Sequence, residues 1–300
     1  MDGTGSSIDQ LEAEAARLID SDPAAAAERA REILRSRPDH GDALRLLAEA
    51  LRRQQRPAEA QEAEIRAIDA SGRIPALAEA ARALAEGRQE QAEDLLLPYL
   101  RRHPTDSAAL VILAEIAFRI GAYSRSEAFL GNVLARVPAY ERARLTLARV
   151  QLAQARLAET GRTLDLLLER DADHREALMM KASVLDQLGD HEQAAELQES
   201  LVRREPRSAE LRVGQGHKLR TLGRTEEAAA AYREALRLDP RCGVAWWALA
   251  DLKTQSFDDA DVAAMSEALE TDEPARNDLS QLHFALSRAF EECGLFEKSF

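Results

Sequence analysis

The chain has 300 residues, a formal net charge of −13, and a composition that is 45% hydrophobic but only 4% aromatic. The acidic balance argues against nucleic acid or an anionic membrane surface as a partner. No apolar run reaches the roughly 20 residues that a membrane-spanning helix requires, and the N-terminal MDGTGSSIDQ lacks the features of a signal peptide.

Helices are expected throughout, because alanine and leucine are abundant while aromatic and β-branched residues are sparse. Residues 1–6 are rich in glycine and serine and are predicted to be disordered. Two-helix units then follow one another. The first, 7–40, carries Asp22-Pro23 between its helices, and the second, 41–72, is shorter and ends without proline.

The next units share one register of about 34 residues. They are predicted at 73–106, 107–140, 141–174, 175–208 and 209–242. The position between the two helices of these units holds Gly87, Gly121, Ala155, Gly189 and Gly223. Proline ends several units, while Pro98 lies inside the second helix of 73–106 and is predicted to bend or shorten it.

The clearest copy is AELRVGQGHKLRTLGRTEEAAAAYREALRLDPRC, residues 209–242. Gly223 is expected to take a left-handed conformation that closes the first helix, and Thr225 is expected to cap the second. Small residues let the two helices approach closely, and one tyrosine fills the space beside them. These residues are Gly216, Ala228, Ala235 and Tyr232.

The last part of the chain keeps the pattern with changes. In the unit 243–279, the first helix begins VAWWALADLK, and Asp258-Asp259 are placed to cap a helix starting near Ala260. A ninth unit is expected at 280–300, with Gly294 between its helices. Because it stops part-way through its second helix and leaves apolar residues uncovered, we expect the sequence to be the front part of a longer protein.

This spacing of small, large, glycine and proline positions resembles the tetratricopeptide repeat (TPR). The resemblance implies an all-α, right-handed superhelix of antiparallel helix pairs from residue 7 to residue 300. It also implies a concave groove, lined by the fifth residue of each first helix, that holds a protein or peptide segment. Those residues are Leu77, Val111, Leu145, Met179, Val213, Trp247 and Phe284.

The alternative is that these side chains pack between repeats. It is equally favoured for the leucines and valines, whereas partial exposure is favoured for Met179, Trp247 and Phe284. Trp246 is expected to be structural. Polar residues of both signs are expected beside the apolar strip, which favours a partner segment of mixed charge. They are Glu115, Arg119, Arg149, Asp186, His217, Arg220, Asp251 and Arg288, although any single one is more simply explained as a solvated surface residue.

The runs AWWALADLKTQSFDDADVAAM (245–265) and LHFALSRAFEECGLFEKSF (282–300) look like the junction in bacterial TPR-sulfotransferases. In that family a TPR array precedes a catalytic domain that uses 3′-phosphoadenosine 5′-phosphosulfate and is related to protein-tyrosine sulfotransferases. The resemblance implies a sulfotransferase domain in cis, whose substrates this array recruits. No phosphate-binding loop follows a strand here, so no catalytic or cofactor-binding residue is carried over, and the chain itself is expected to be inactive.

Two other functions stay open. The chain is alternatively a free-standing adaptor without enzymatic activity, or it associates with itself through apolar ends. The six histidines form no HxxxH or HExxH face, and the two cysteines form neither a CxxC pair nor a zinc pattern. Neither a metal nor a cofactor is therefore expected, and cysteine usage favours a reduced, cytoplasmic compartment.

Overall fold

The computed structural model describes residues 3–252, 256–270 and 276–292. These ranges contain helices and no strand, which confirms the predicted all-α class. The helices are α1 (Gly3–Leu18), α2 (Pro23–Ser36), α3 (Gly41–Arg53), α4 (Pro57–Ser71), α5 (Pro75–Ala85), α6 (Gln89–Arg102), α7 (Ser107–Arg119), α8 (Tyr123–Arg136), α9 (Glu141–Ala153), α10 (Leu157–Leu168), α11 (Arg175–Gln187), α12 (His191–Arg204), α13 (Ala209–Thr221), α14 (Thr225–Leu238), α15 (Gly243–Asp251), α16 (Asp259–Glu270) and α17 (Arg276–Glu292).

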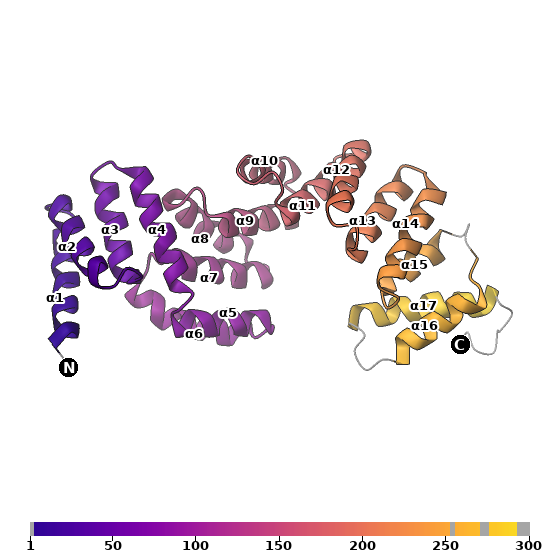
Figure 1. Cartoon of the computed structure of the whole chain (residues 1–300), viewed down its shortest axis with the longest axis horizontal. Helices are drawn as coiled ribbons and strands as arrows, with labels where there is room; N and C mark the ends of the chain where they lie inside the picture. The colour runs from indigo at the N-terminus through magenta and orange to yellow at the C-terminus, as the bar shows by residue number, and fades with distance from the viewer. Residues whose placement is uncertain (1–2, 253–255, 271–275, 293–300) are drawn as a thin grey trace. The chain divides into compact units, whose positions relative to one another are not determined.

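The chain forms two compact units, unit 1 (Met1–Thr163) and unit 2 (Leu164–Phe300). Within unit 1, α1 packs on α2, α3 on α4, α5 on α6 and α7 on α8; within unit 2, α11 packs on α12 and α13 on α14 (Figure 1). Each of these pairs lies inside one predicted repeat, except that α1 starts at Gly3. Residues 3–6 are therefore helical and not disordered as predicted, because α1 continues back through them without a proline.

The residue between paired helices adopts the left-handed conformation at five of the predicted positions. The φ values are +75° at Gly87 and Gly121, +87° at Gly189, +73° at Gly223 and +56° at Ala155. After Gly223 the amide of Arg224 donates to the carbonyl of Leu219 at 2.9 Å, which closes the end of α13. The predicted turn between helices is thereby confirmed, and Ala155 carries the steric cost of about 1 kcal/mol that glycine avoids.

Three local predictions differ in their outcome: two concern residues that cap a helix, and one concerns a proline inside a helix. Thr225 does not cap α14, because it is the first residue of the helix and Arg224 occupies the N-cap position. The side chain of Arg224 makes no capping hydrogen bond. Asp258 does cap α16, since its Oδ1 accepts from the amide of Asp261 at 2.9 Å. Pro98 lies within α6, which still runs from Gln89 to Arg102, so of the two predicted effects, bending or shortening, the shortening does not occur.

The core of unit 2 contains the close contacts predicted for 209–242. Tyr232, Ala228 and Ala235 are completely buried, and Gly216 lies beneath the Tyr232 ring. Trp246 is 3% exposed, and its Nε1 donates to the carbonyl of Pro240 at 2.9 Å, which confirms its structural role. The small residues thus set the separation of α13 and α14.

The C-terminal helices depart from the repeat pattern. Both α15 and α16 pack against α17. Because no glycine or proline occurs between Arg276 and Glu292, α17 starts before the predicted boundary at Ser280 and continues through it. The predicted turn at Gly294 and the unfinished second helix lie outside the described residues.

Candidate functional site

The seven predicted groove residues divide into a buried and an accessible set. Leu77, Val111, Leu145 and Val213 are at most 8% exposed, so these four side chains pack in the core. Met179 and Trp247 are partly buried, and Phe284 is 53% exposed. A continuous accessible strip is therefore not formed by these positions. The accessible ones all lie in unit 2, on α11, α15 and α17.

Phe284 is accessible because other residues of α17 form the face that packs against the core. On α17 the side chains of Leu282, Ala285 and Ala289 are completely buried against the core of unit 2. Phe284 lies on another face of the same helix, as the spacing of these positions on a 3.6-residue turn requires. Trp247, on the adjacent helix α15, packs partly against the same core.

In unit 1 the predicted polar residues form a local ion-pair group. Arg119 Nε lies 3.2 Å from one oxygen of Glu115, and Arg149 Nη1 lies 3.7 Å from the other. Arg119 also donates from Nη1 to the carbonyl of Leu84 at 2.5 Å. Glu115 is thus shared between α7 and α9, and Arg119 connects α7 to α5.

In unit 2 the corresponding residues join successive first helices. Lys218 Nζ on α13 lies 2.8 Å from Asp186 on α11, and Arg220 Nη1 lies 2.7 Å from Asp251 on α15. Although burial opposes it, hydrogen bonds from Lys218 and His191 hold the pKa of Asp186 below 3.8. The Arg288 guanidinium on α17 donates to the carbonyl of Ala250 and pairs with Glu292. Among these residues the sign of the charge therefore alternates from one first helix to the next, with a carboxylate on α11, cations on α13, a carboxylate on α15 and a cation on α17.

His217 is in hydrogen-bond contact with Tyr232. Burial raises the pKa of Tyr232 to about 12, so its hydroxyl is protonated, and this hydroxyl lies 2.9 Å from His217 Nδ1. Burial, with repulsion from Arg220 and Lys218, lowers the pKa of His217 below 6.5. The imidazole is consequently neutral near pH 7.

Acidification should destabilise unit 2 through His217. Its pKa is lower in the folded than in the unfolded chain, so the stabilisation is present above pH 6.5 and is lost as the pH falls below that value. We expect the melting temperature of wild type to fall more steeply between about pH 7.5 and about pH 5.5 than that of His217→Gln. Scanning calorimetry of both, with the exposed His283→Gln as a control, tests this. Equal slopes for wild type and His217→Gln would contradict it.

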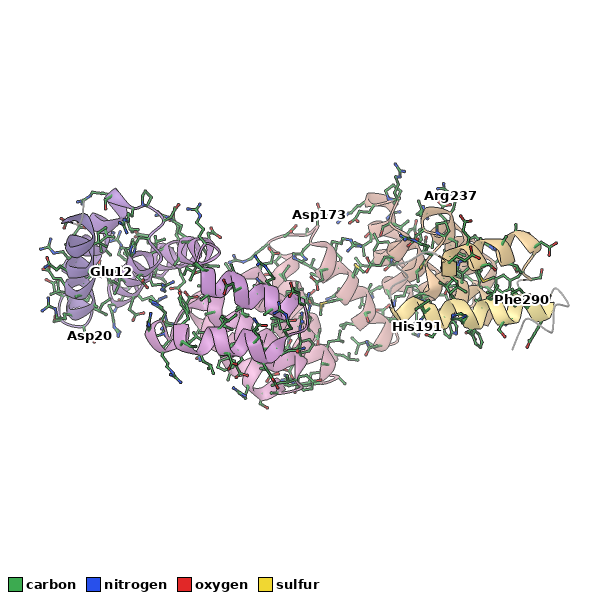
Figure 2. All side chains as sticks on the ribbon, turned by 90° about the horizontal axis from the view of Figure 1, so that it is seen from below. Glu12, Asp20, Asp173, His191, Arg237 and Phe290 are labelled. Carbon is green, nitrogen blue, oxygen red and sulfur yellow. The ribbon has the colours of Figure 1, made fainter. Side chains whose placement is uncertain are left out.

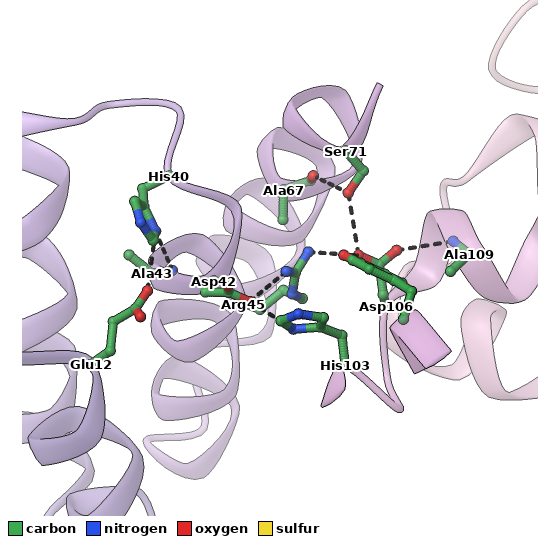
Figure 3. A network of polar contacts seen from close by, with 11 residues as sticks. Glu12, His40, Asp42, Ala43, Arg45, Ala67, Ser71, His103, Asp106 and Ala109 are labelled. Carbon is green, nitrogen blue, oxygen red and sulfur yellow. Dashed lines mark hydrogen bonds and ion pairs between the residues drawn. The ribbon is translucent and has the colours of Figure 1, made fainter. Parts of the chain in front are cut away.

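A second cluster of ionisable side chains, in unit 1, was not predicted (Figure 3). Its centre is Asp106, which is 1% exposed and precedes α7. Its Oδ1 accepts from the amide of Ala109 at 2.9 Å. Its Oδ2 accepts from Arg45 Nη1 at 2.6 Å and from the Tyr99 hydroxyl at 2.7 Å, and Ser71 Oγ lies at 3.3 Å.

The same cluster extends along α3 and α4. Arg45 also donates from Nη2 to Asp42 at 2.6 Å, and His103 Nδ1 lies 2.9 Å from the same carboxylate. Nearby, the buried Glu64 accepts from Ser107 Oγ at 2.9 Å and from Arg52 Nη2 at 2.9 Å. These bonds connect α3 and α4 to α6 and α7, which identifies the cluster as a tie between repeats.

Only one part of this cluster had a signal in the sequence. An aspartate directly before a helix is a typical N-cap, and Asp106 occupies that position. Its cationic partner lies 61 residues away in the sequence, which no local pattern reveals. The carboxylates and the guanidinium are all engaged with one another, so the arrangement stabilises the fold.

Neither a metal site nor a membrane span is found in the residues that the structure describes. No group of three or more His, Cys, Asp or Glu side chains there is arranged to hold a metal ion. None of the described helices is both long and apolar enough to cross a bilayer. Figure 2 shows the side chains of the two units, with Glu12 labelled on α1 and Phe290 on α17.

Several solved structures are similar to the chain. A tetratricopeptide repeat protein from Parabacteroides merdae is 14% identical, with 94% of this chain and 99% of that one covered at a TM-score of 0.49. A thermophilic TPR protein from Thermus thermophilus is 21% identical over 64% of this chain and 97% of its own, also at 0.49. MamA from Desulfovibrio magneticus is 18% identical over 55% of this chain and 93% of its own, again at 0.49. No curated protein matches the sequence.

Family models give the assignment. Models described as "Tetratricopeptide repeat" match residues 16–73, 121–184, 176–208 and 213–275, which together make up more than half of the chain. They agree with the paired helices, the left-handed turns and the buried small residues described above. They do not support the more specific link to sulfotransferases. The chain belongs to the tetratricopeptide repeat family.

Proposed function

We propose that the chain is a protein-binding scaffold whose binding face in unit 2 is formed by the first helices of its repeats. The observation that carries this proposal is Phe284, a large aromatic side chain that is 53% exposed on α17, the helix packed against α15 with its partly accessible Trp247. Aromatic side chains are enriched among the residues that dominate binding energy at protein interfaces.

The polar surroundings support a partner of mixed charge. Arg220 and Asp251 pair with each other at 2.7 Å and are both substantially accessible, so an incoming carboxylate or ammonium group can compete for either. Such pairs at the edge of an interface contribute more to selectivity than to affinity. The aromatic side chains would then supply the affinity.

Substitution of Phe284 should weaken binding of a segment selected on this face. Peptides selected from a random display library against the chain serve as probes, and dissociation constants are measured by fluorescence anisotropy. We expect Phe284→Ala to weaken binding by about tenfold or more, the effect of losing an aromatic hot spot. Trp247→Ala is expected to act in the same direction.

Ile120→Ala provides the matched control, because Ile120 in unit 1 is 56% exposed, close to the value for Phe284. It should leave the dissociation constants unchanged. Selected peptides that bind Phe284→Ala and Trp247→Ala as tightly as wild type would show that the binding face lies elsewhere.

The wider setting of this scaffold is proposed in two forms. In the first, the array recruits substrates for a sulfotransferase in cis, for which the support is the junction-like sequence at 245–265 and 282–300. In the second, it is an adaptor without enzymatic activity, for which the support is the family assignment alone.

Calorimetry with 3′-phosphoadenosine 5′-phosphosulfate separates the two forms. The titration is made with the longest natural form of the protein and, in parallel, with residues 1–300. Donor binding by a longer form alone supports the sulfotransferase setting. Absence of binding in both favours the adaptor.

A further inference from the structure

A groove lined by leucine lies beside α12 in unit 2. It has a volume of about 410 Å³ and is bounded by α11, α12 and the end of α10. Four leucines line it, of which Leu178 is 6% exposed and the other three are partly buried. They are Leu168, Leu178, Leu185 and Leu197, and we call this feature the leucine groove.

The polar groups at its edge are mostly engaged within the protein. Lys181 pairs with Asp165, and Ser200 Oγ donates to the carbonyl of Leu197 at 2.7 Å. Gln193 donates to Asp190. Glu196 differs, because no cation pairs with it in the described part of the chain. The edge of the leucine groove at α12 therefore carries one carboxylate without an ion-pair partner.

A second glutamate on α12 reinforces this charge. Glu192 lies one turn before Glu196 and is exposed; it does not line the leucine groove itself but a neighbouring cavity with Lys218 and Arg224, and no ion pair to either is formed. Two like charges at this spacing destabilise an isolated helix. The helix dipole favours Glu192, which lies in the first turn of α12, but no ion-pair partner in the described part of the chain offsets the repulsion between it and Glu196.

We propose that the leucine groove binds a basic amphipathic helix of a partner protein. The apolar face of that helix would occupy the groove, and its lysine or arginine side chains would pair with Glu192 and Glu196. Charge complementarity selects this occupant: the groove edge is acidic, and the chain has a net charge of −13. Burying apolar side chains in a groove beside a charged edge is a common mode of helix recognition. This site is separate from the face around Phe284 and does not depend on it.

The test uses a fluorescein-labelled peptide of about 15 residues, with leucine at helical spacing on one face and lysine on the other. Anisotropy titrations are made with the whole chain. We expect micromolar binding that weakens about tenfold in Glu192→Gln/Glu196→Gln at about 0.05 M salt. The difference between the two proteins should shrink to about twofold at about 0.5 M salt, where surface charges are screened.

The matched control is Glu267→Gln/Glu270→Gln, which makes the same change in net charge at exposed positions of α16. It should bind the peptide as wild type does. Leu185→Ala, checked for an unchanged melting curve, should weaken binding about fivefold by removing part of the groove lining. Phe284→Ala should have no effect.

Four results would overturn the proposal. The first is equal weakening by the two double glutamine variants, which would indicate attraction to net charge alone. The second is equally tight binding of a peptide whose lysines are replaced by glutamate. The third is loss of binding in Phe284→Ala, which would place the peptide on the other face. The last is absence of binding by wild type at millimolar concentrations of peptide.

Discussion

Replacing Asp106 by alanine should lower the free energy of unfolding by about 3–5 kcal/mol. The carboxylate is buried, and its removal leaves the guanidinium of Arg45 with only one of its two anionic partners. It also removes the acceptor of the Tyr99 hydroxyl and the cap of α7. Urea unfolding followed by far-ultraviolet circular dichroism measures the effect, and hydrogen exchange locates it in unit 1.

Asp39→Ala is the control for Asp106→Ala. Asp39 is exposed and pairs with Arg73, so the substitution removes an aspartate–arginine ion pair at the surface instead of in the interior. Its expected effect is within about 1 kcal/mol, as for most surface ion pairs. If the two variants unfold at the same urea concentration, the cluster around Asp106 does not tie the repeats together.

Gly216→Ala should destabilise unit 2 by about 3 kcal/mol, the upper part of the range for overpacking a core. An added Cβ at residue 216 would lie 2.3 Å from Cε1 of Tyr232, a ring that is completely buried. Either the ring or α13 must shift, and this shift also strains the hydrogen bond between Tyr232 and His217. Both tryptophans of the chain lie in unit 2, so tryptophan fluorescence during urea unfolding reports the loss directly.

Two variants make this measurement specific. Gly131→Ala, in the middle of α8, has no atom within 4 Å of the added Cβ and should instead stabilise the protein by about 0.5–1 kcal/mol. Gly216→Ala/Tyr232→Leu removes the ring that clashes and should be less destabilised than the sum of the two single variants. If the losses of stability of the two single variants simply add in the double variant, contact with the Tyr232 ring is not the cause of the destabilisation by Gly216→Ala.

Much of the repeat architecture was determined by the sequence. The recurring glycine predicted the left-handed turns, because few other residues adopt positive φ without cost, and the structure has them at Gly87, Gly121, Gly189 and Gly223. The small residues of 209–242 predicted the close contact at Gly216, because helix separation depends on side-chain size. Both features depend on residues close together in the chain, where the period of the repeat is informative.

Tertiary structure alone decided which of the equivalent positions are accessible. Val213, Trp247 and Phe284 occupy the same place in their repeats, yet only Phe284 is more than half exposed. The period fixes the direction of a side chain on its own helix, whereas its exposure depends on how the next helix packs. The start of α17 before Ser280 was missed for a related reason, since the repeat register does not determine where a helix begins when no residue interrupts it.

The cluster around Asp106 shows the same division more sharply. The sequence determined that this chain consists of paired helices with capped ends, because propensities, turns and caps act over a few residues. The pairing of Asp106 with Arg45, and of Ser107 with Glu64, joins residues 61 and 43 positions apart. Such contacts exist only once the helices are stacked, because stacking sets the distance and the burial that make a charge pair strong.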